Sequence, residues 1–270
     1  MITSSANPTI KQIRKLRDRK ERQQTGLFYA EGLRIVIEAA HQNASIQTLV
    51  YAPEILTSEQ GMQEIRELQK RGTDIVEVSE SVFRSLALKD DPQGIAAVVA
   101  QAWLSLDQIK LGDSDLWVAL EEVADPGNLG TILRTCDGVG AKGVVLLDHS
   151  TDPYDPTAMR ASMGAVFTQK LVKTDLDHFR AWAKANDVPL IGTSGAARLD
   201  YHIFTYPTKF MLLMGSERQG LSEKALAMCD EVVRIPMTGQ ADSLNLAVAT
   251  AVVLYEVYNN RRNGKMEGKI

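Results

Sequence analysis

The sequence predicts an α/β protein whose larger part is a parallel sheet covered by helices on both faces. From residue 116 onward, apolar segments of strand length alternate with segments of helical periodicity. The apolar segments are nearly continuous, as expected for strands that are buried on both faces. A smaller α/β unit precedes them and ends near residue 102. We therefore expect domains at 1–102 and 116–262, joined by a linker of mixed polarity at 103–115.

The smaller unit begins with a basic arm, and one interpretation of it is an amphipathic helix whose apolar residues Ile10, Ile13 and Leu16 face inward. A short apolar stretch then leads through Gly32 into a helix with a broad buried face. The pattern of the whole unit predicts strands at 48–52, 74–78 and 94–102, and helices at 33–40, 58–72 and 79–88.

The larger unit ends in a long apolar helix that Ser243, Leu244 and Asn245 open. A helix N-cap needs only one such polar residue, so the surplus indicates that the preceding loop holds something. The strands of this unit are predicted at 116–122, 144–148, 170–173, 189–194, 209–216 and 231–237, and its helices at 129–140, 156–167, 176–187, 222–230 and 243–260.

Composition narrows the class of protein. The chain has 270 residues, of which 44% are hydrophobic and 24% charged, as in ordinary globular proteins. No apolar run approaches the roughly 18 residues of a membrane span, and the N-terminus lacks the apolar core of a signal peptide. Two cysteines and four histidines show neither disulfide nor metal-binding spacing. We expect a cytoplasmic, reduced protein without a metal.

A basic arm stands out against a net charge of −4: residues 11 to 34 contain eight basic and three acidic side chains. Such an arm can contact phosphates although the chain as a whole is acidic, because affinity depends on the contacting surface. The alternative is the solvated face of an amphipathic helix. The candidate phosphate contacts are Arg14, Arg17, Lys20, Arg22 and Arg34.

Three loops follow strands of the predicted parallel sheet: ADPGN, GSERQG and TGQADS. Ligands bind beyond the carboxyl ends of such strands. No GxGxxG, GxxxxGK[ST] or G-x-S-x-G pattern is present, so neither a dinucleotide fingerprint, a P-loop nor a nucleophile elbow is supported. Taken singly, Asn128 is explained as an N-cap, Arg134 as a surface charge and Glu217 as a helix-start carboxylate. Their recurrence at three such loops favours a shared site.

Three segments resemble the motifs of one family: NLGTILRTCDGVGAKGVVLL, MLLMGSERQGLS and IPMTGQADSLNLAVATAVVLYE. They are similar to those of the SpoU/TrmH family of RNA ribose 2′-O-methyltransferases, which belongs to the SPOUT class with its deep C-terminal trefoil knot. YDPTAMRASMGAVF resembles the family's stretch between its first two motifs. FYAEGLRIVIEA and DPQGIAAVV resemble an accessory substrate-binding domain similar to ribosomal protein L30e. The departures are small: Cys136 replaces a common Ala, and Arg218 and Gln219 fill a variable pair.

The resemblance implies a site for S-adenosyl-L-methionine and a reaction centre. In this family the last helix passes through an earlier loop, which would bring the third motif beside the second. Cofactor contacts would come from Thr193, Gly215, Ile235, Met237 and Leu244. The reaction centre would contain Arg134, Asn128, Glu217, Ser243 and Asn245.

The expected roles at that centre follow from side-chain chemistry. The family's arginine, Arg134 here, is described as activating the 2′-hydroxyl. A guanidinium is a poor proton acceptor, so anchoring a phosphate is physically easier. The asparagines would orient the ribose or fix the loops, Glu217 would order loops, and Ser243 would bond a phosphate or cap the last helix. Arg160 is a further RNA candidate, with an ion pair to Asp155 as the alternative.

The function expected from this resemblance is 2′-O-methylation of a ribose in RNA by a homodimer. The accessory domain favours ribosomal RNA, 23S above all, over transfer RNA, a choice that rests on analogy. A non-catalytic RNA-binding factor of ribosome assembly is the alternative from another class. An unknotted nucleotide-dependent oxidoreductase ranks far below, because its fingerprint is missing.

Overall fold

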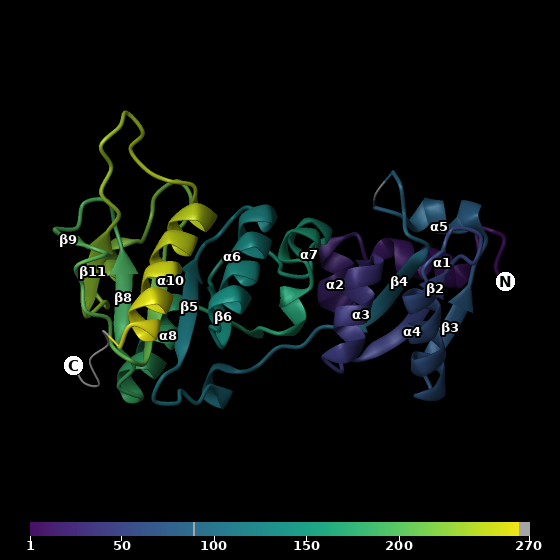
Figure 1. Cartoon of the computed structure of the whole chain (residues 1–270), viewed down its shortest axis with the longest axis horizontal. Coiled ribbons are helices and arrows are strands. Elements are labelled where there is room, and N and C mark those ends of the chain that lie inside the picture. The colour runs from purple at the N-terminus through teal and green to yellow at the C-terminus, as the bar shows by residue number, and fades with distance from the viewer. Residues whose placement is uncertain (89, 265–270) are drawn as a thin grey trace. The chain divides into compact units, whose positions relative to one another are not determined.

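The computed structural model describes residues 1–88 and 90–264 and divides into two compact units (Figure 1). The first unit contains Met1–Ala102 together with Tyr154–Thr168, and the second contains Trp103–Pro153 and the chain from Gln169 onward. The segment 154–168 thus belongs to the first unit although its neighbours on both sides belong to the second. The domain boundaries predicted from the sequence, at residues 102 and 116, remain a prediction.

The first unit is built on a four-stranded sheet in the order β1–β4–β2–β3. Strand β4 is antiparallel to both of its neighbours, and β2 and β3 are parallel. Its strands are β1 (Leu27–Glu31), β2 (Ile46–Tyr51), β3 (Asp74–Glu77) and β4 (Ile95–Ala100), and its helices are α1 (Pro8–Lys15), α2 (Arg19–Thr25), α3 (Leu33–His41), α4 (Glu59–Lys70), α5 (Glu80–Leu86), α7 (Pro156–Ser162) and the 3-10 turn η2 (Ala165–Phe167).

The basic arm forms two helices, α1 and α2, where the sequence predicted one. Asn7 caps α1 by accepting a hydrogen bond from Thr9 N–H, and Pro8 occupies its first position. The predicted inward face is confirmed, since Ile10, Ile13 and Leu16 are buried. The charged side chains between these positions therefore project from a helix that is fixed to the core.

Segment 154–168 packs within the first unit through aromatic contacts. The ring of Tyr154 lies 4.5 Å from that of Phe28, and the ring of Phe167 lies 6.2 Å from it. The predicted single helix at 156–167 is wrong: it breaks after Ser162, because Met163 and Gly164 both adopt positive φ, at 53° and 98°. The break turns η2 back toward Phe28.

Arg22 is a structural residue, which corrects its predicted role as an RNA contact. Its side chain is 1% exposed, so it is not available to a phosphate at the surface. The guanidinium donates to the carbonyls of Leu16 and Arg17 at 3.0 and 2.7 Å. It also pairs with Asp155 Oδ2 at 3.3 Å. Arg22 therefore ties the basic arm to segment 154–168, and it is Arg22, not Arg160, that pairs with Asp155.

We expect Arg22→Met to lower the free energy of unfolding by about 2–3 kcal/mol, because it leaves two carbonyls and a half-buried carboxylate without their donor. Urea denaturation followed by circular dichroism measures this loss. Lys20→Met, which removes an exposed charge two residues away, is the matched control and should change stability by less than about 0.5 kcal/mol. Equal effects of the two substitutions would show that the buried donor is not what stabilises the arm.

The second unit is a seven-stranded sheet in the order β7–β6–β5–β10–β8–β11–β9, and every pair of neighbours in it is parallel. The predicted parallel α/β architecture is confirmed. The strands are β5 (Leu116–Glu121), β6 (Gly143–Leu147), β7 (Lys170–Thr174), β8 (Leu190–Thr193), β9 (Leu199–Asp200), β10 (Phe210–Met214) and β11 (Glu231–Arg234), and the helices are α6 (Pro126–Val139), α8 (Leu176–Ala185), α9 (Glu223–Leu226) and α10 (Leu246–Arg262).

Side chains of this sheet are buried on both faces, which explains the continuous apolar strands in the sequence. Trp117 and Ala119 of β5 belong to a core that includes Phe179 and Trp182 of α8. Alternation along the strand directs Val118 and Leu120, also fully buried, to the opposite face. Helices α6 and α10 pack against each other and lie side by side in Figure 1. These two helices begin at the edge of the sheet where the candidate site lies.

The predicted linker at 103–115 packs on the second unit. Leu104 N–H donates to the carbonyl of Leu171 at 2.8 Å, beside the end strand β7. Ile109 is 5% exposed and belongs to the core beneath α8. Between them lies the 3-10 turn η1 (Leu106–Gln108). This segment is therefore held along most of its length.

Within residues 1–88 and 90–264, no helix is long and apolar enough to cross a membrane.

Candidate functional site

Four adjacent strands of the second sheet, β5, β10, β8 and β11, end at one edge. The carboxyl ends of β5, β10 and β11 lead into the loops that carry the three sequence motifs: 122–125, 215–222 and 235–245. In parallel sheets this edge is where ligands bind. The structure therefore brings together residues as far apart in sequence as Asn128 and Asn245, which are separated by 117 positions.

A chain of hydrogen bonds joins the three loops. Glu217 Oε1 accepts from Asn128 Nδ2 at 3.0 Å, and Asn245 Nδ2 donates to Asn128 Oδ1 at 2.9 Å. The Glu217 carboxylate also accepts the backbone N–H groups of Ala124 and Asp125, both at 3.1 Å. Each motif thus contributes one side chain to a single network. These bonds support the prediction that Glu217 orders loops.

The helix caps differ from those expected. Asp125, not Asn128, caps α6: its Oδ1 accepts Asn128 N–H at 2.7 Å. Asn245, not Ser243, caps α10, because its Oδ1 accepts Ala247 N–H at 2.9 Å and Val248 N–H at 3.3 Å. The side-chain amide of Asn128 is therefore free for the network, and the Ser243 side chain is exposed.

Glu217 is held in its ionised form. Partial burial by itself raises the pKa of the carboxyl group, but the hydrogen bonds from Asn128 and from Ala124 N–H outweigh it, and the pKa lies below its usual value. A lowered pKa in the folded state contributes stability that is present above the ordinary pKa of glutamate and is lost as pH falls through the lowered value. The network is therefore intact at neutral pH.

A pocket of about 290 Å³ opens beside this network. Its lining includes all five residues predicted to contact the cofactor, together with Glu217 and Ser243. The five are Thr193, Gly215, Ile235, Met237 and Leu244. The size is that of a small-molecule site.

The shape and chemistry of this pocket fit S-adenosylmethionine. Apolar side chains at the ends of β10 and β11, such as Met214 and Val233, can enclose a purine. Gly215 approaches the backbone of the same loop so closely that an added Cβ would lie 1.9 Å from the Gly220 carbonyl carbon. Only glycine permits this packing, and Gly215 is one of the residues that line the pocket.

Glu121 supports the site and was missed by the sequence reasoning. It ends strand β5 and is 6% exposed. One carboxylate oxygen accepts Ser222 N–H at 2.8 Å and the other accepts its hydroxyl at 2.5 Å. This fixes the end of the loop that begins at Gly215. An acidic residue within an otherwise apolar strand was the available signal.

Arg134 lies away from the pocket lining. It is exposed on α6, roughly two turns beyond Asn128, and its guanidinium has no hydrogen bond or ion pair with any described residue. The guanidinium is therefore available to bind a substrate phosphate. Ser243, also exposed, does line the pocket.

Three arginines of the first unit donate to the C-terminal end of α5 and to the two residues that follow it. Arg14 donates to Ser85 Oγ at 2.9 Å, and Arg17 donates to the carbonyls of Ser85 and Ala87 at 3.3 and 2.9 Å. Arg160 donates to the carbonyl of Leu88 at 3.3 Å. The other two candidates, Lys20 and Arg34, are exposed.

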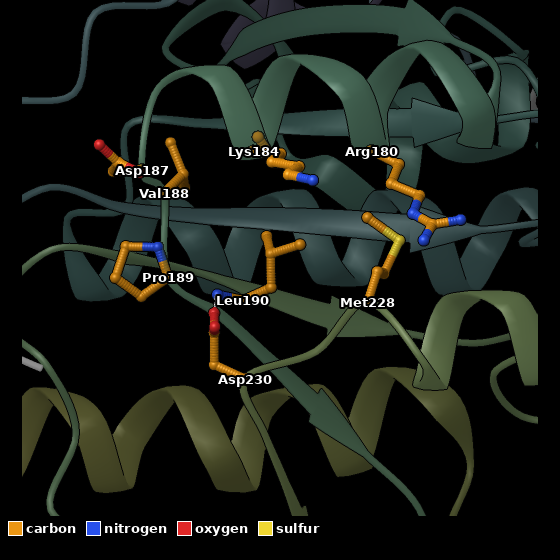
Figure 2. A pocket seen from close by; sticks show the side chains of 9 residues that line it. Arg180, Lys184, Asp187, Val188, Pro189, Leu190, Met228 and Asp230 are labelled. Carbon is orange, nitrogen blue, oxygen red and sulfur yellow. Dashed lines mark hydrogen bonds between the residues drawn. The ribbon is translucent and has the colours of Figure 1, made fainter.

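A second cavity, of about 400 Å³, lies at the opposite ends of the strands (Figure 2). Arg180 and Lys184 project from α8 over a floor that includes Leu190 and Met228, and Asp230 Oδ2 accepts Leu190 N–H at 2.8 Å. Although larger, it contains no predicted site residue. It lies at the amino ends of the strands, where open parallel sheets do not bind their ligands. Among the residues described, no group of three or more His, Cys, Asp or Glu could hold a metal ion.

Comparison with known proteins agrees with this geometry. Residues 115–255 match the SpoU rRNA methylase family, and residues 7–97 match the MRM3-like substrate-binding domain. The 23S rRNA (guanosine(2553)-2′-O)-methyltransferase RlmP of Bacillus subtilis is 31% identical over 95% of this chain and 98% of its own length. A 23S rRNA (uridine(2479)-2′-O)-methyltransferase of Streptomyces viridochromogenes is 30% identical over 93% of this chain and 88% of its own.

Among solved structures, the S-adenosylmethionine-bound rRNA methyltransferase from Sinorhizobium meliloti has a TM-score of 0.89 and 38% identity, and 97% of each chain is covered. The class that the fold and pocket define is a methyltransferase built on a parallel sheet. The chain belongs to the SpoU rRNA methylase family. The resemblance predicted from the three motifs is confirmed.

Proposed function

We propose that this protein transfers a methyl group from S-adenosylmethionine to the 2′-hydroxyl of a ribose in RNA, with 23S ribosomal RNA as the substrate. The observation that carries the proposal is the pocket beside the Glu217–Asn128–Asn245 network, because it joins a nucleoside-sized cavity to polar groups from all three motifs. Incubation with ribosomal RNA and labelled cofactor, followed by nuclease digestion, tests it. Label on a base rather than on ribose oxygen would overturn the reaction class.

The chemistry requires alignment more than activation. The bound cofactor supplies an electrophilic methyl carbon, so the protein must hold the 2′-hydroxyl in line with it and assist loss of its proton. Asn128 and Asn245 are fixed to each other and to Glu217, which lets the network serve as a rigid wall for the ribose. Ser243 lines the pocket and can donate to a substrate phosphate.

Arg134 is proposed to anchor the phosphate of the target nucleotide and to stabilise the developing alkoxide. Its exposure on α6 leaves its donors available for a bidentate contact. A guanidinium is a poor proton acceptor, so we assign Arg134 no role as a base.

Two alternatives differ in substrate or in class. A transfer RNA enzyme of the same family would methylate transfer RNA in the assay above and leave ribosomal RNA unlabelled. A non-catalytic assembly factor would bind RNA without binding the cofactor. The intact network and the pocket count against the factor, since a scaffold needs neither. Calorimetry with S-adenosylmethionine separates the factor from both enzymes.

We propose that the first unit binds RNA with Arg14, Arg17 and Arg160 around residues 85–88, at the C-terminal end of α5, assisted by Lys20 and Arg34. The three arginines donate to Ser85, Ala87 and Leu88, so their charges are concentrated in one place. Each retains further guanidinium donors for a phosphate. Concentrated positive charge binds nucleic acid largely by releasing counterions.

Replacing these three arginines by glutamine should reduce the slope of log affinity against log salt by about 2 to 3, because each lost phosphate contact contributes roughly 0.7 to 0.9. Filter binding to a ribosomal RNA fragment at several salt concentrations measures the slope. The control changes Arg66, Lys70 and Arg71, at the end of α4, to glutamine, which removes the same charge elsewhere in the unit. An equal reduction in the control would mean that the arginines around residues 85–88 have no special role.

We propose a homodimer through the exposed face of α10. Val248 and Tyr255 are each 49% exposed and lie seven residues apart, which places them on one face of the helix. Packing this face against a second copy would remove its apolar side chains from water. A twofold interface would use the same face on both copies.

Val248→Asp should therefore convert the dimer to a monomer, since a charge would be buried at the interface. Sedimentation velocity at micromolar concentration measures the change. Ile203→Asp is the matched control, because Ile203 is 65% exposed in a turn of the same unit and distant in sequence from α10. Wild-type protein that sediments as a monomer would refute the dimer itself.

We also propose the trefoil knot and a cytoplasmic location. Strand β10 lies between β5 and β8 although it follows β8 in the chain, and α10 returns from β11 to pack against α6; both support a threaded path. Mechanical stretching from both termini tests it, because a knotted chain extends short of its full contour length.

The proposed substrate is made in the bacterial cytoplasm, and Cys136 and Cys229 are unbridged. Fractionation of cells that produce the protein tests the location.

A further inference from the structure

The cofactor pocket contains two charges that the network does not use. Its charged lining residues are Glu217, Arg218 and Asp242. The Glu217 carboxylate already accepts hydrogen bonds from Asn128 and from two backbone N–H groups. Arg218 and Asp242 have no hydrogen bond or ion pair with any described residue, and they are not paired with each other. Two opposite charges are therefore available within one pocket.

The backbone beneath Arg218 is fixed, whereas its side chain is exposed. Ser216 and Gly220 exchange two backbone hydrogen bonds, at 3.1 and 3.0 Å, and Ser216 Oγ accepts Gln219 N–H at 3.3 Å. Arg218 is thus at the tip of a closed turn. Asp242 comes from a different loop, between β11 and α10. The two charges approach the pocket from separate segments, as they would to recognise the two ends of one ligand group.

We propose that Arg218 and Asp242 recognise the amino-acid end of S-adenosylmethionine: Arg218 binds its carboxylate, and Asp242 attracts its ammonium group. The inference rests on the proposed function and assigns a task to the variable position 218. The apolar part of the pocket suits adenosine, which is neutral, so the zwitterionic end needs partners elsewhere. A guanidinium matches a carboxylate in two parallel hydrogen bonds, and a carboxylate attracts an ammonium.

An RNA phosphate is the competing partner for Arg218. The presence of Asp242 in the same lining disfavours it, because a carboxylate repels a phosphate but complements the positive part of a zwitterion. The α-amino-acid group carries both charges that the pocket leaves open. The pair of residues therefore selects for the cofactor and not for the RNA backbone.

Calorimetry with three ligands tests the assignment. S-adenosylmethionine and S-adenosylhomocysteine both contain the amino-acid end, whereas 5′-methylthioadenosine lacks it. Arg218→Met should weaken the first two by about 10- to 100-fold, the range of a charge-assisted hydrogen bond, and leave 5′-methylthioadenosine within about twofold. Arg218→Lys should recover part of the loss, and Asp242→Asn should show a smaller loss with the same ligand dependence. Lys224→Met, on α9 and outside the pocket lining, should change none of the three.

The outcomes that overturn the proposal are distinct. Equal weakening of all three ligands would give Arg218 a structural role. Unchanged affinities together with a higher KM for RNA would make Arg218 a phosphate contact. If the wild-type protein binds none of the three ligands, the proposed function itself fails. If the wild type binds them and the variants bind them equally well, only the assignment of Arg218 and Asp242 fails.

Discussion

Replacing Arg134 by alanine should reduce methyl transfer by about 100-fold or more while S-adenosylmethionine affinity stays within about twofold. The reason is positional: the side chain is exposed on α6 and does not line the cofactor pocket, so its loss removes a substrate contact and leaves the pocket intact. Single-turnover assays with saturating RNA measure the rate, and calorimetry measures the cofactor affinity.

Arg180→Ala is the matched control for this prediction. Arg180 is another exposed helical arginine of the second unit, but it lies at the amino ends of the strands beside the larger cavity (Figure 2). It should retain the wild-type rate. A variant at Arg134 that keeps more than about a tenth of the activity would contradict the proposed anchoring role, because one lost transition-state contact has a larger effect.

Gly215→Ala should abolish measurable cofactor binding, with a loss of about 100-fold or more. The added Cβ would lie 1.9 Å from the carbonyl carbon of Gly220 and 2.1 Å from the nitrogen of Leu221. Both neighbours are backbone atoms, so no side chain can move aside, and the turn that closes between Ser216 and Gly220 must open. Calorimetry with S-adenosylmethionine measures the loss.

Gly239→Ala tests whether the effect is specific to that close approach. Gly239 also lies in a loop at the same edge of the sheet, yet no atom lies within 4 Å of an added Cβ. The Gly239→Ala variant should therefore bind S-adenosylmethionine with wild-type affinity. Thermal unfolding of both variants shows whether they fold. A folded Gly215→Ala protein that binds the cofactor normally would mean that this backbone contact does not shape the pocket.

The order of strands and helices in the second unit could be predicted because burial on both faces leaves a strong pattern. Continuous apolar runs such as Leu116–Glu121 and Phe210–Met214 mark its central strands. Element ends were less accurate. The sequence offered Asn128 and Ser243 as caps, but Asp125 and Asn245 stood nearby with equal capping ability, and only the folded loops decide between such neighbours.

The candidate site could also be predicted only in part. The five residues predicted to contact the cofactor all line the pocket, and the structure adds how the three motifs are joined, through Glu217, Asn128 and Asn245. Charge alone misled at Arg22, because a basic residue in a basic arm looks like its neighbours until its burial is known. Glu121 was missed because its partner, Ser222, lies 101 residues away and no local spacing reveals the bond.

Segment 154–168 has a consequence for how such proteins can evolve. It is encoded between strands of the second unit, yet its aromatic residues and Asp155 complete the core of the first. A genetic exchange that brought in a different first unit would leave this segment facing unfamiliar partners. The first unit and the segment must therefore diversify together, so the inheritance of the first unit is tied to a stretch of coding sequence that lies within the second.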